Sequence, residues 1–259
     1  MNLGLDDKVI IITGGSSGIG LATAALLLEE GARVAICGRD TQRLATAAAE
    51  LGHPDRLLAA SADVLETEQV EGFVARVAER WGAVDALVNN AGQSRMSTYA
   101  NTSDDEWRDE LDLKFFGMLR PTRAAEPYLR TSDVGTIVNV NAVLARQPEG
   151  RLVATSAARA GALNLTKSLS VELAPDIRVN AVLLGLIDSG QWRRRFEQAD
   201  TGQTYDEWCA ALAANRGIVL GRLGRPDEAA TVIATLLSPR TGYVTGTTIE
   251  VAGGVSRSV

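Results

Sequence analysis

The sequence predicts an α/β fold in which a seven-stranded, mainly parallel sheet has helices on both faces. Short apolar runs alternate with longer amphipathic segments along most of the chain. The short runs have the length and the β-branched content of buried strands, and the longer segments carry the Ala, Leu, Glu and Arg that favour helices. Such an alternation is typical of βαβ crossovers, which bury a parallel sheet between two layers of helices.

The elements follow one another without a linker, a repeat or a low-complexity tract. The candidate strands are residues 9–13, 33–37, 57–61, 86–89, 136–141, 178–183 and 247–251. The candidate helices are residues 19–30, 43–50, 66–81, 104–129, 154–173 and 227–236. We therefore expect one domain over residues 1–259. Residues 187–220 interrupt the alternation, and we expect them to form a substrate lid, because ligands of open α/β sheets bind beyond the carboxyl ends of the strands.

Composition excludes several classes of function. The 26 basic and 32 acidic residues give a formal charge of -6, which argues against a nucleic-acid-binding surface. His53 is the single histidine and lies in a turn, so catalytic triads and metal sites that need histidine are disfavoured. Cys37 and Cys209 do not form a disulfide framework, and no apolar run approaches the ~18 residues of a membrane-spanning helix. We expect a soluble, cytoplasmic protein with no membrane partner.

The segment TGGSSGIG at residues 13–20 joins the first strand to the first helix. Glycines in such a turn let backbone amides approach a pyrophosphate, and the helix dipole favours that anion. The spacing is G-x-x-x-G-x-G rather than the general G-x-G-x-x-G, so the turn alone is a weak signal and could be an ordinary tight turn. The nucleotide contacts expected here come from Gly14, Ser16, Ser17, Gly18, Ile19 and Gly20.

Further segments, in the same order along nearly the whole chain, resemble those of the short-chain dehydrogenase/reductase family. They are ADV at 62–64, NNAG at 89–92, RVN at 178–180, TG at 245–246 and VAGG at 251–254. The resemblance implies a Rossmann-type doubly wound fold with a nicotinamide dinucleotide cofactor, and a homodimer or homotetramer formed through two long helices. It also implies contacts to the adenine from Asp63 and Val64, to the ribose beside the nicotinamide from Asn90 with Ala91 and Gly92, and to the carboxamide from Ile187.

The end of the second strand favours NADP(H) over NAD(H). A carboxylate usually binds the free ribose 2'-hydroxyl of NAD(H) at this point, but Gly38 stands there and Arg39 follows. A guanidinium suits a 2'-phosphate, and Ser16 or Ser17 can add hydroxyl donors. The alternative is that Arg39 is an exposed residue at the start of a helix, beside Asp40.

The four positions that carry catalysis in the resembled family are all substituted. In that family a Tyr transfers the proton, a Lys lowers the pKa of that Tyr and holds the ribose, a Ser positions the substrate oxygen, and an Asn supports a water relay. Here Thr155, Arg159, Ala142 and Lys114 stand at these positions, in that order. An aliphatic hydroxyl is a far weaker acid than a phenol, whose reference pKa is about 10, so Thr155 does not simply inherit the proton transfer. Arg159 stays charged and can still hold the ribose.

Lys114 is the best remaining titratable candidate. Desolvation beside Arg159 would lower its pKa toward neutrality and make it a general acid, a general base or a Schiff-base amine. The alternative is that Lys114 only anchors a substrate carboxylate or pairs with Asp112 or another neighbour. Asn141 is a second candidate, since its amide can bind a substrate carbonyl, although it can equally cap the strand end.

Arginines surround the expected cleft: Arg95, Arg146, Arg151 and Arg193 to Arg195. Their field would suit an anionic small-molecule substrate such as a carboxylate or a phosphate-bearing acyl thioester, unless they are solvated surface residues. The leading hypothesis is an NADP(H)-dependent oxidoreductase similar to 3-oxoacyl carrier-protein reductases, with C=C reduction favoured over ketone reduction. Two alternatives stay open: a non-redox isomerase or lyase, and a catalytically inactive nucleotide-sensing protein.

Overall fold

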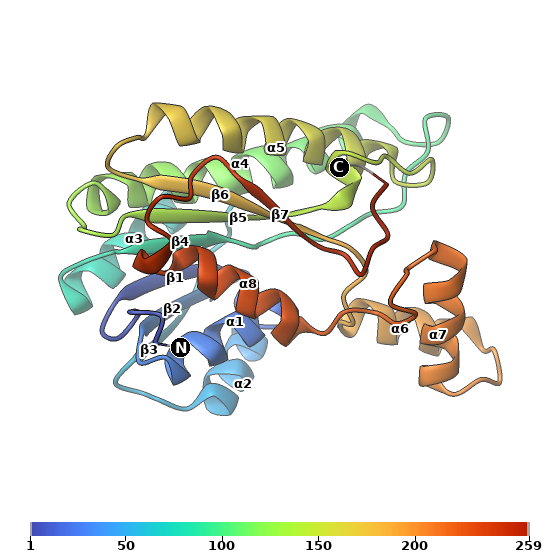
Figure 1. Cartoon of the computed structure of the whole chain (residues 1–259), viewed down its shortest axis with the longest axis horizontal. Helices are drawn as coiled ribbons and strands as arrows, with labels where there is room; N and C mark the ends of the chain where they lie inside the picture. Colours follow the sequence, from blue (N-terminus) through green and yellow to red (C-terminus); the bar gives the residue numbers. More distant parts are fainter. Residues whose placement is uncertain (1, 258–259) are drawn as a thin grey trace.

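The sheet has seven strands in the order β3-β2-β1-β4-β5-β6-β7 (Figure 1), and every neighbouring pair is parallel. The computed structural model describes residues 2–257. The strands are β1 (Val9–Thr13), β2 (Arg33–Gly38), β3 (Leu57–Ser61), β4 (Ala86–Asn89), β5 (Thr136–Ala142), β6 (Arg178–Leu184) and β7 (Thr248–Val251). The predicted Rossmann-type, doubly wound fold is confirmed.

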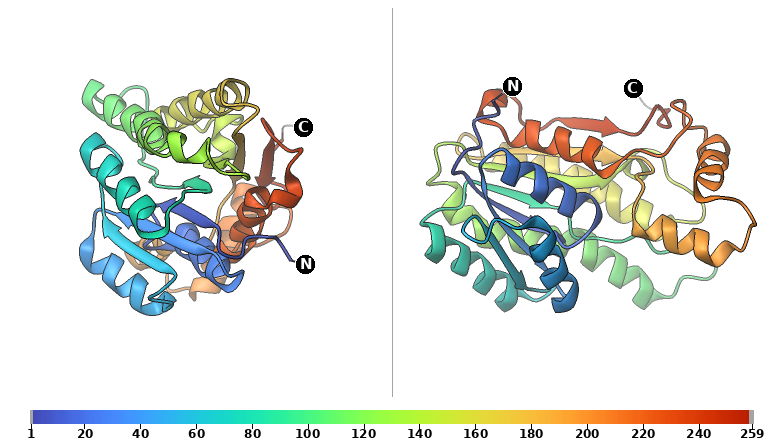
Figure 2. Two further views of the ribbon diagram at one scale, coloured as in Figure 1. Left: turned by 90° about the vertical axis from the view of Figure 1, so that its left-hand side faces the viewer. Right: turned by 90° about the horizontal axis from the view of Figure 1, so that it is seen from below.

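Helices cover both faces of this sheet. They are α1 (Gly18–Glu29), α2 (Thr41–Leu51), α3 (Thr67–Trp81), α4 (Asp104–Leu129), α5 (Val153–Glu172), α6 (Gly190–Ala199), α7 (Tyr205–Arg216) and α8 (Pro226–Leu237), with short 3-10 turns η1 (Val143–Ala145) and η2 (Pro239–Thr241). Helices α1, α2 and α8 pack on one face, and α3, α4 and α5 pack on the other (Figure 2). No helix within residues 2–257 is long and apolar enough to cross a membrane.

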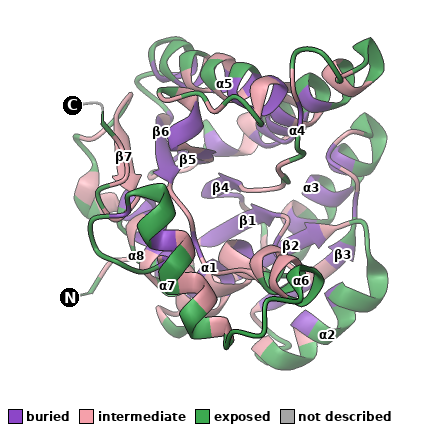
Figure 3. Cartoon of the chain, turned by 90° about the vertical axis from the view of Figure 1, so that its right-hand side faces the viewer, coloured by how far each residue is buried: buried purple, intermediate pink, exposed green. Residues whose placement is uncertain are grey.

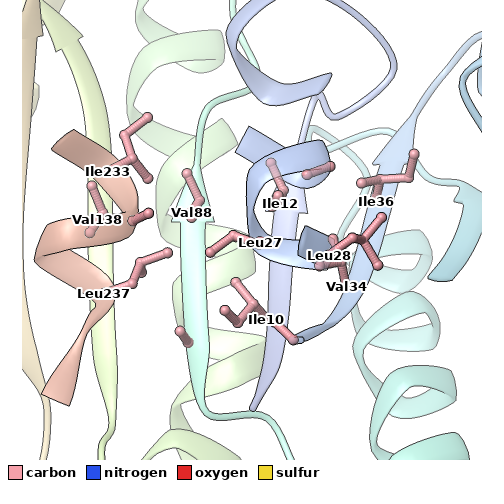
Figure 4. Close-up of a cluster of buried hydrophobic side chains, with 14 of the residues drawn as sticks. Ile10, Ile12, Leu27, Leu28, Val34, Ile36, Val88, Val138, Ile233 and Leu237 are labelled. Atoms are coloured by element: carbon pink, nitrogen blue, oxygen red, sulfur yellow. The ribbon is translucent and has the colours of Figure 1, made fainter. Parts of the chain in front are cut away.

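The two layers bury two apolar cores, one on each side of the sheet. Alternate residues of β1 point to opposite faces, so Ile10 and Ile12 join the core under α1 and α8, whereas Ile11 joins the core under α3 to α5. Figure 4 shows the first of these cores, with Leu27 of α1 packed near Ile10. Each fully buried Ile contributes about 1.5–3 kcal/mol relative to an exposed one. The strands are buried throughout most of the sheet, as Figure 3 shows.

The strand order places a ligand site between β1 and β4. The chain runs outward from β1 to β2 and β3, then returns to β4 on the other side of β1. Connections leave the carboxyl ends of β1 and β4 in opposite directions, and the crevice at such a switch point binds ligands in open α/β sheets.

The element boundaries differ from the sequence prediction in places that have local causes. Helix α2 begins at Thr41 rather than at 43, because the Asp40 side chain accepts a hydrogen bond from the Arg43 N–H at 2.9 Å and caps the helix. Helix α8 begins at Pro226, whose fixed φ suits the first helical position. The segment 187–220 contains two helices, α6 and α7, which were not predicted as regular elements. Both lie beyond the end of the sheet, at the right of Figure 1.

Candidate active site

A cavity of about 1170 Å³ opens at the carboxyl ends of β1, β4, β5 and β6. Most of the residues predicted to bind the cofactor or substrate line it: Gly14, Ser16, Ser17, Gly18, Ile19, Arg39, Asp63, Val64, Asn90, Ala91, Gly92, Lys114, Asn141, Arg159 and Ile187. Segments far apart in the sequence therefore meet around one hollow. Gly20 and Thr155 lie outside this lining, and both are buried.

The Asn-Asn-Ala-Gly segment is held against the end of β1 by a small hydrogen-bond network. The Thr13 hydroxyl accepts the backbone N–H groups of Asn90 and Ala91, each at 3.0 Å. The Asn90 side-chain amide donates to the carbonyls of Thr13 and Gly14, each at 3.0 Å. These bonds fix the floor of the cavity at the switch point.

The glycine-rich turn requires glycine for reasons of space. Gly14 has φ 67°, and a Cβ there would lie 2.9 Å from the Ala91 Cα. A Cβ on Gly20 would lie 2.4 Å from the Gly14 carbonyl oxygen, so a side chain at position 20 would clash with the backbone of the turn. Ser17 stands at the N-cap of α1 and makes no side-chain capping bond, which leaves the first-turn amides available to an anion.

Arg39 lies at the outer end of the cavity. Its side chain is 67% exposed, and its Nη1 is 3.8 Å from the Asp63 carboxylate. Arg43, from the first turn of α2, lines the same end and also contacts Asp40 at 3.3 Å. Arg43 was not predicted from the sequence, although its position four residues after Arg39 places both residues near the start of one helix. Two guanidinium groups at this end of the cavity favour the binding of a phosphate group in addition to a pyrophosphate at the glycine-rich turn.

Lys114 is buried in α4, with 7% of its surface exposed. Its Nζ donates a hydrogen bond to the Gln93 carbonyl at 2.6 Å and lies 3.5 Å from the Glu110 carboxylate. Burial lowers the pKa of Lys114 to about 8, helped by the Arg159 charge and opposed by Glu110. Asp112, the partner considered from the sequence, is exposed, and the carboxylate beside Lys114 is Glu110.

Thr155 and Arg159 lie one turn apart on α5 and face different surroundings. Thr155 has no exposed surface, and its hydroxyl donates to Glu110 at 2.7 Å. Arg159 lines the cavity and donates to the Asn141 side-chain oxygen at 3.3 Å. Burial lowers the pKa of Arg159 to about 10, so the guanidinium remains charged at neutral pH. Its Nε is buried and has no hydrogen-bond partner within residues 2–257, which leaves one donor for a ligand.

The Asn141 amide is occupied by local bonds. Its nitrogen donates to the Arg159 carbonyl at 3.0 Å, and its oxygen accepts from the Ala142 N–H at 2.8 Å. The side chain thus ties the end of β5 to α5, and it lines the cavity in that arrangement.

Glu110 is the residue of this cluster that sequence reasoning missed. It is 3% exposed, although it stands in an acidic stretch of α4 whose other members resemble a solvated helix face. Its spacing could have indicated its place beside Lys114, since a glutamate four residues before a lysine lies on the same face of a helix.

The arginines expected around the cleft divide into two groups. Arg151, Arg194 and Arg195 line the cavity, and so does Arg216, which the sequence analysis did not identify and which pairs with Glu149. Arg95 pairs with Asp109 at 3.3 Å and Arg146 with Glu250 at 3.1 Å, and Arg193 lies over the Tyr205 ring at 4.3 Å. These last three have partners outside the cavity wall.

Helices α6 and α7 pack together through aromatic rings. Trp208 of α7 lies 6.3 Å from Trp192 and 5.8 Å from Phe196 between ring centroids. Trp192 also lines the cavity. The Tyr205 hydroxyl donates to Asp188 at 2.5 Å and ties α7 to the segment that follows β6.

Fold and cavity together define a dinucleotide-binding α/β protein, and comparisons with known proteins extend this assignment. The family model for short chain dehydrogenases matches residues 8–200. The 3-oxoacyl-[acyl-carrier-protein] reductase of Thermotoga maritima is 33% identical over 253 residues, which cover 97% of this chain and 98% of that protein.

Two solved structures are similar over the whole fold. An NADPH-bound short chain oxidoreductase of Pseudomonas aeruginosa PAO1, described as containing an atypical catalytic center, has a TM-score of 0.93 at 51% identity and covers 98% of this chain and 100% of its own. The L-sorbose reductase of Gluconobacter frateurii, complexed with NADPH and L-sorbose, has a TM-score of 0.95 at 31% identity and covers 100% of both chains. The chain belongs to the short-chain dehydrogenase/reductase family, and it is an oxidoreductase of that type.

Proposed function

We propose that this protein transfers a hydride between NADP(H) and a small anionic substrate, preferably an acyl thioester, and that Lys114 exchanges the accompanying proton. The observation that carries the proposal is the buried Lys114 ammonium group at the wall of the same cavity that contains the nucleotide-binding turn. The NADPH-bound Pseudomonas relative and the acyl-carrier-protein reductase support the cofactor and the substrate class.

The residues that line the cavity fit NADP(H). The Gly14 turn leaves room that a Cβ would fill, and the α1 amides suit the pyrophosphate. Arg39 and Arg43 suit the 2'-phosphate. The buried Nε of Arg159 is a free donor for ribose hydroxyls. When bound, NADPH supplies the hydride.

Lys114 supplies the proton in this proposal. A group whose pKa is near 8 is partly charged and partly neutral at neutral to mildly alkaline pH, so it can give a proton and recover it from solvent. The Thr155 hydroxyl is engaged with the Glu110 carboxylate. Hydride addition to a conjugated C=C bond is favoured over ketone reduction, because the extended enolate needs less help from a strong acid at oxygen.

Residues 187–220 are proposed to close over the substrate. Arg194 and Arg195 of α6 line the cavity, and a lid that carries them would bring positive charge to an anionic substrate. The whole of residues 1–259 would then act as one catalytic domain. Association through α4 and α5 into dimers or tetramers belongs to the same proposal, and the exposure of Leu111 and Phe116 on α4 supports it.

The test uses purified protein, NADPH that carries deuterium at both C4 positions, and a panel of 3-oxoacyl and 2-enoyl thioesters of coenzyme A. We expect deuterium to appear in the reduced enoyl product as NADPH is consumed. Consumption of NADPH with 3-oxoacyl substrates alone would show that the protein reduces ketones and not C=C bonds. Turnover without deuterium transfer would indicate an isomerase or lyase, and tight NADPH binding without turnover would indicate a nucleotide-sensing protein.

A further inference from the structure

Glu110 is a buried carboxylate that lies behind the cavity wall, 3.5 Å from the Lys114 ammonium nitrogen. It belongs neither to the glycine-rich turn nor to the four substituted positions. It lies on α4 one helical turn before Lys114 and is 3% exposed. Carboxylates are almost never buried to this extent unless they are paired, because the loss of hydration is costly.

Its contacts join the two long helices of the site. The same oxygen, Oε2, accepts the Thr155 hydroxyl of α5 at 2.7 Å and lies 3.5 Å from the Lys114 ammonium nitrogen. Thr155 has no exposed surface, so its hydroxyl proton is directed at Glu110 from within the protein. Lys114 is held from its other side by the Gln93 carbonyl, at 2.6 Å.

Within residues 2–257, three charged side chains act on Lys114, and Glu110 is the one carboxylate among them. Arg159 faces it from α5 and Arg95 from the segment that follows β4, and both disfavour the ammonium form. The neighbouring carboxylates of α4 are directed elsewhere, since Asp109 pairs with Arg95 at 3.3 Å and Asp112 is exposed. Without Glu110, two buried or partly buried cations would face each other at the cavity wall.

We propose that Glu110 is a positioning residue: its carboxylate is the counter-ion that keeps Lys114 protonated at the cavity wall, and it holds the Thr155 hydroxyl out of the cavity. Through Lys114 this inference rests on the proposed function. It also explains why Thr155 stands where the resembled family has Tyr: the Thr155 hydroxyl binds Glu110 inside the protein and does not take over the proton transfer of the Tyr hydroxyl. The direction of the Glu110 effect on the Lys114 pKa, which is upward, supports the geometry.

The experiment follows the ionisation of Lys114 without needing a substrate. The chain contains three lysines, Lys8, Lys114 and Lys167. In protein labelled with ¹³C at the lysine Cε, NMR gives three assignable titration curves, and Lys8 and Lys167 serve as internal references. The variants are Glu110→Gln, which keeps the size and an acceptor for Thr155, Thr155→Val, which removes the hydroxyl, and Asp105→Asn, which removes a carboxylate of the same helix that pairs with Arg108 at 2.7 Å on the surface.

We expect Glu110→Gln to move the Lys114 midpoint to lower pH by about 1 to 3 pH units, which is about a 10- to 1,000-fold loss of proton affinity. Thr155→Val and Asp105→Asn should leave the midpoint close to that of the wild type. An unchanged midpoint in Glu110→Gln would overturn the proposal. A displacement in Thr155→Val as large as that in Glu110→Gln would also overturn it, because packing between α4 and α5 would then control Lys114.

Circular dichroism checks that each variant is folded. If Glu110→Gln does not fold, Glu110→Asp keeps the charge one methylene farther from Lys114 and should displace the midpoint in the same direction by less; no displacement there contradicts the inference. The titration tests the pairing of Glu110 with Lys114, and the deuterium-transfer assay tests the proposed function, so a negative result in one does not imply a negative result in the other. A Lys114 midpoint that depends on Glu110 in a protein that transfers no deuterium would preserve the pairing and remove the oxidoreductase proposal.

Discussion

Replacement of Arg39 by Ala tests the proposed cofactor preference at the outer end of the cavity. Arg39 lines this end, and its partner within residues 2–257 is Asp63, at 3.8 Å. A 2'-phosphate would provide a stronger partner for the guanidinium through charge-assisted hydrogen bonds. NADH lacks that phosphate, so Arg39→Ala should weaken NADPH binding and leave NADH binding nearly unchanged.

The size of the effect follows from the exposure of the side chain. Hydrogen bonds to charged groups contribute about 1.5–3 kcal/mol. Because the Arg39 side chain is 67% exposed, solvent screens the interaction, and we expect the lower part of this range, about 1.5–2 kcal/mol. This corresponds to about a 10- to 30-fold increase in the Kd for NADPH.

Titrations of NADPH and NADH fluorescence with the wild type and the variant measure both constants. Arg33→Ala is the control, since Arg33 begins the same strand at its far end and pairs with Asp7 at 3.1 Å. Higher ionic strength should reduce the wild-type preference for NADPH. Equal losses of NADPH and NADH affinity, or no loss of either, would refute the assignment of Arg39 to the 2'-phosphate.

Three further variants test the glycine-rich turn, the cap of α4 and the proposed lid. Gly14→Ala, at φ 67° and with its Cβ 2.9 Å from Ala91, should weaken NADPH binding in the same titration, whereas Gly72→Ala, where nothing lies within 4 Å, should not; equal behaviour of the two would contradict the steric argument. Ser103→Ala removes the capping box of α4 and should cost about 1 kcal/mol, seen as a lower Tm with an unchanged Kd for NADPH; an unaltered Tm would show that the cap contributes nothing. Trp208→Ala loosens the contact between α6 and α7 and should raise the KM for the thioester several-fold more than the Kd for NADPH, and parallel changes would argue against a lid.

The sequence was sufficient for the sheet and for bringing the glycine-rich turn and the Asn-Asn-Ala-Gly segment to one cavity. Strands such as 9–13 are continuous apolar runs because both faces of a parallel sheet are covered, and this pattern is visible without the fold. The glycine-rich turn and the Asn-Asn-Ala-Gly segment each follow a strand, so the topology alone brings them to one edge. Helices α6 and α7 were less evident, because they do not pack on the sheet: α6 has no buried residue, and α7 has one, Ala213.

The charged half of the site needed three-dimensional information. Asp105, Asp109 and Glu110 look equivalent in the acidic start of α4, yet only the helix orientation shows that Glu110 is buried beside Lys114 while the two aspartates are exposed. The sequence also did not show which arginines face the cavity. Arg216 lines the cavity whereas Arg146 pairs elsewhere, and their sequence neighbours do not distinguish them.

The pH dependence of kcat/KM shows whether Lys114 exchanges the proton. If the ammonium form of Lys114 is the acid, the rate of thioester reduction should fall about tenfold per pH unit above a midpoint near the Lys114 pKa of about 8. This limb should persist in Thr155→Val and in the control Lys167→Met, and it should disappear with most of the activity in Lys114→Met. A Lys114→Met enzyme that keeps the same limb and rate would show that Lys114 does not exchange the proton.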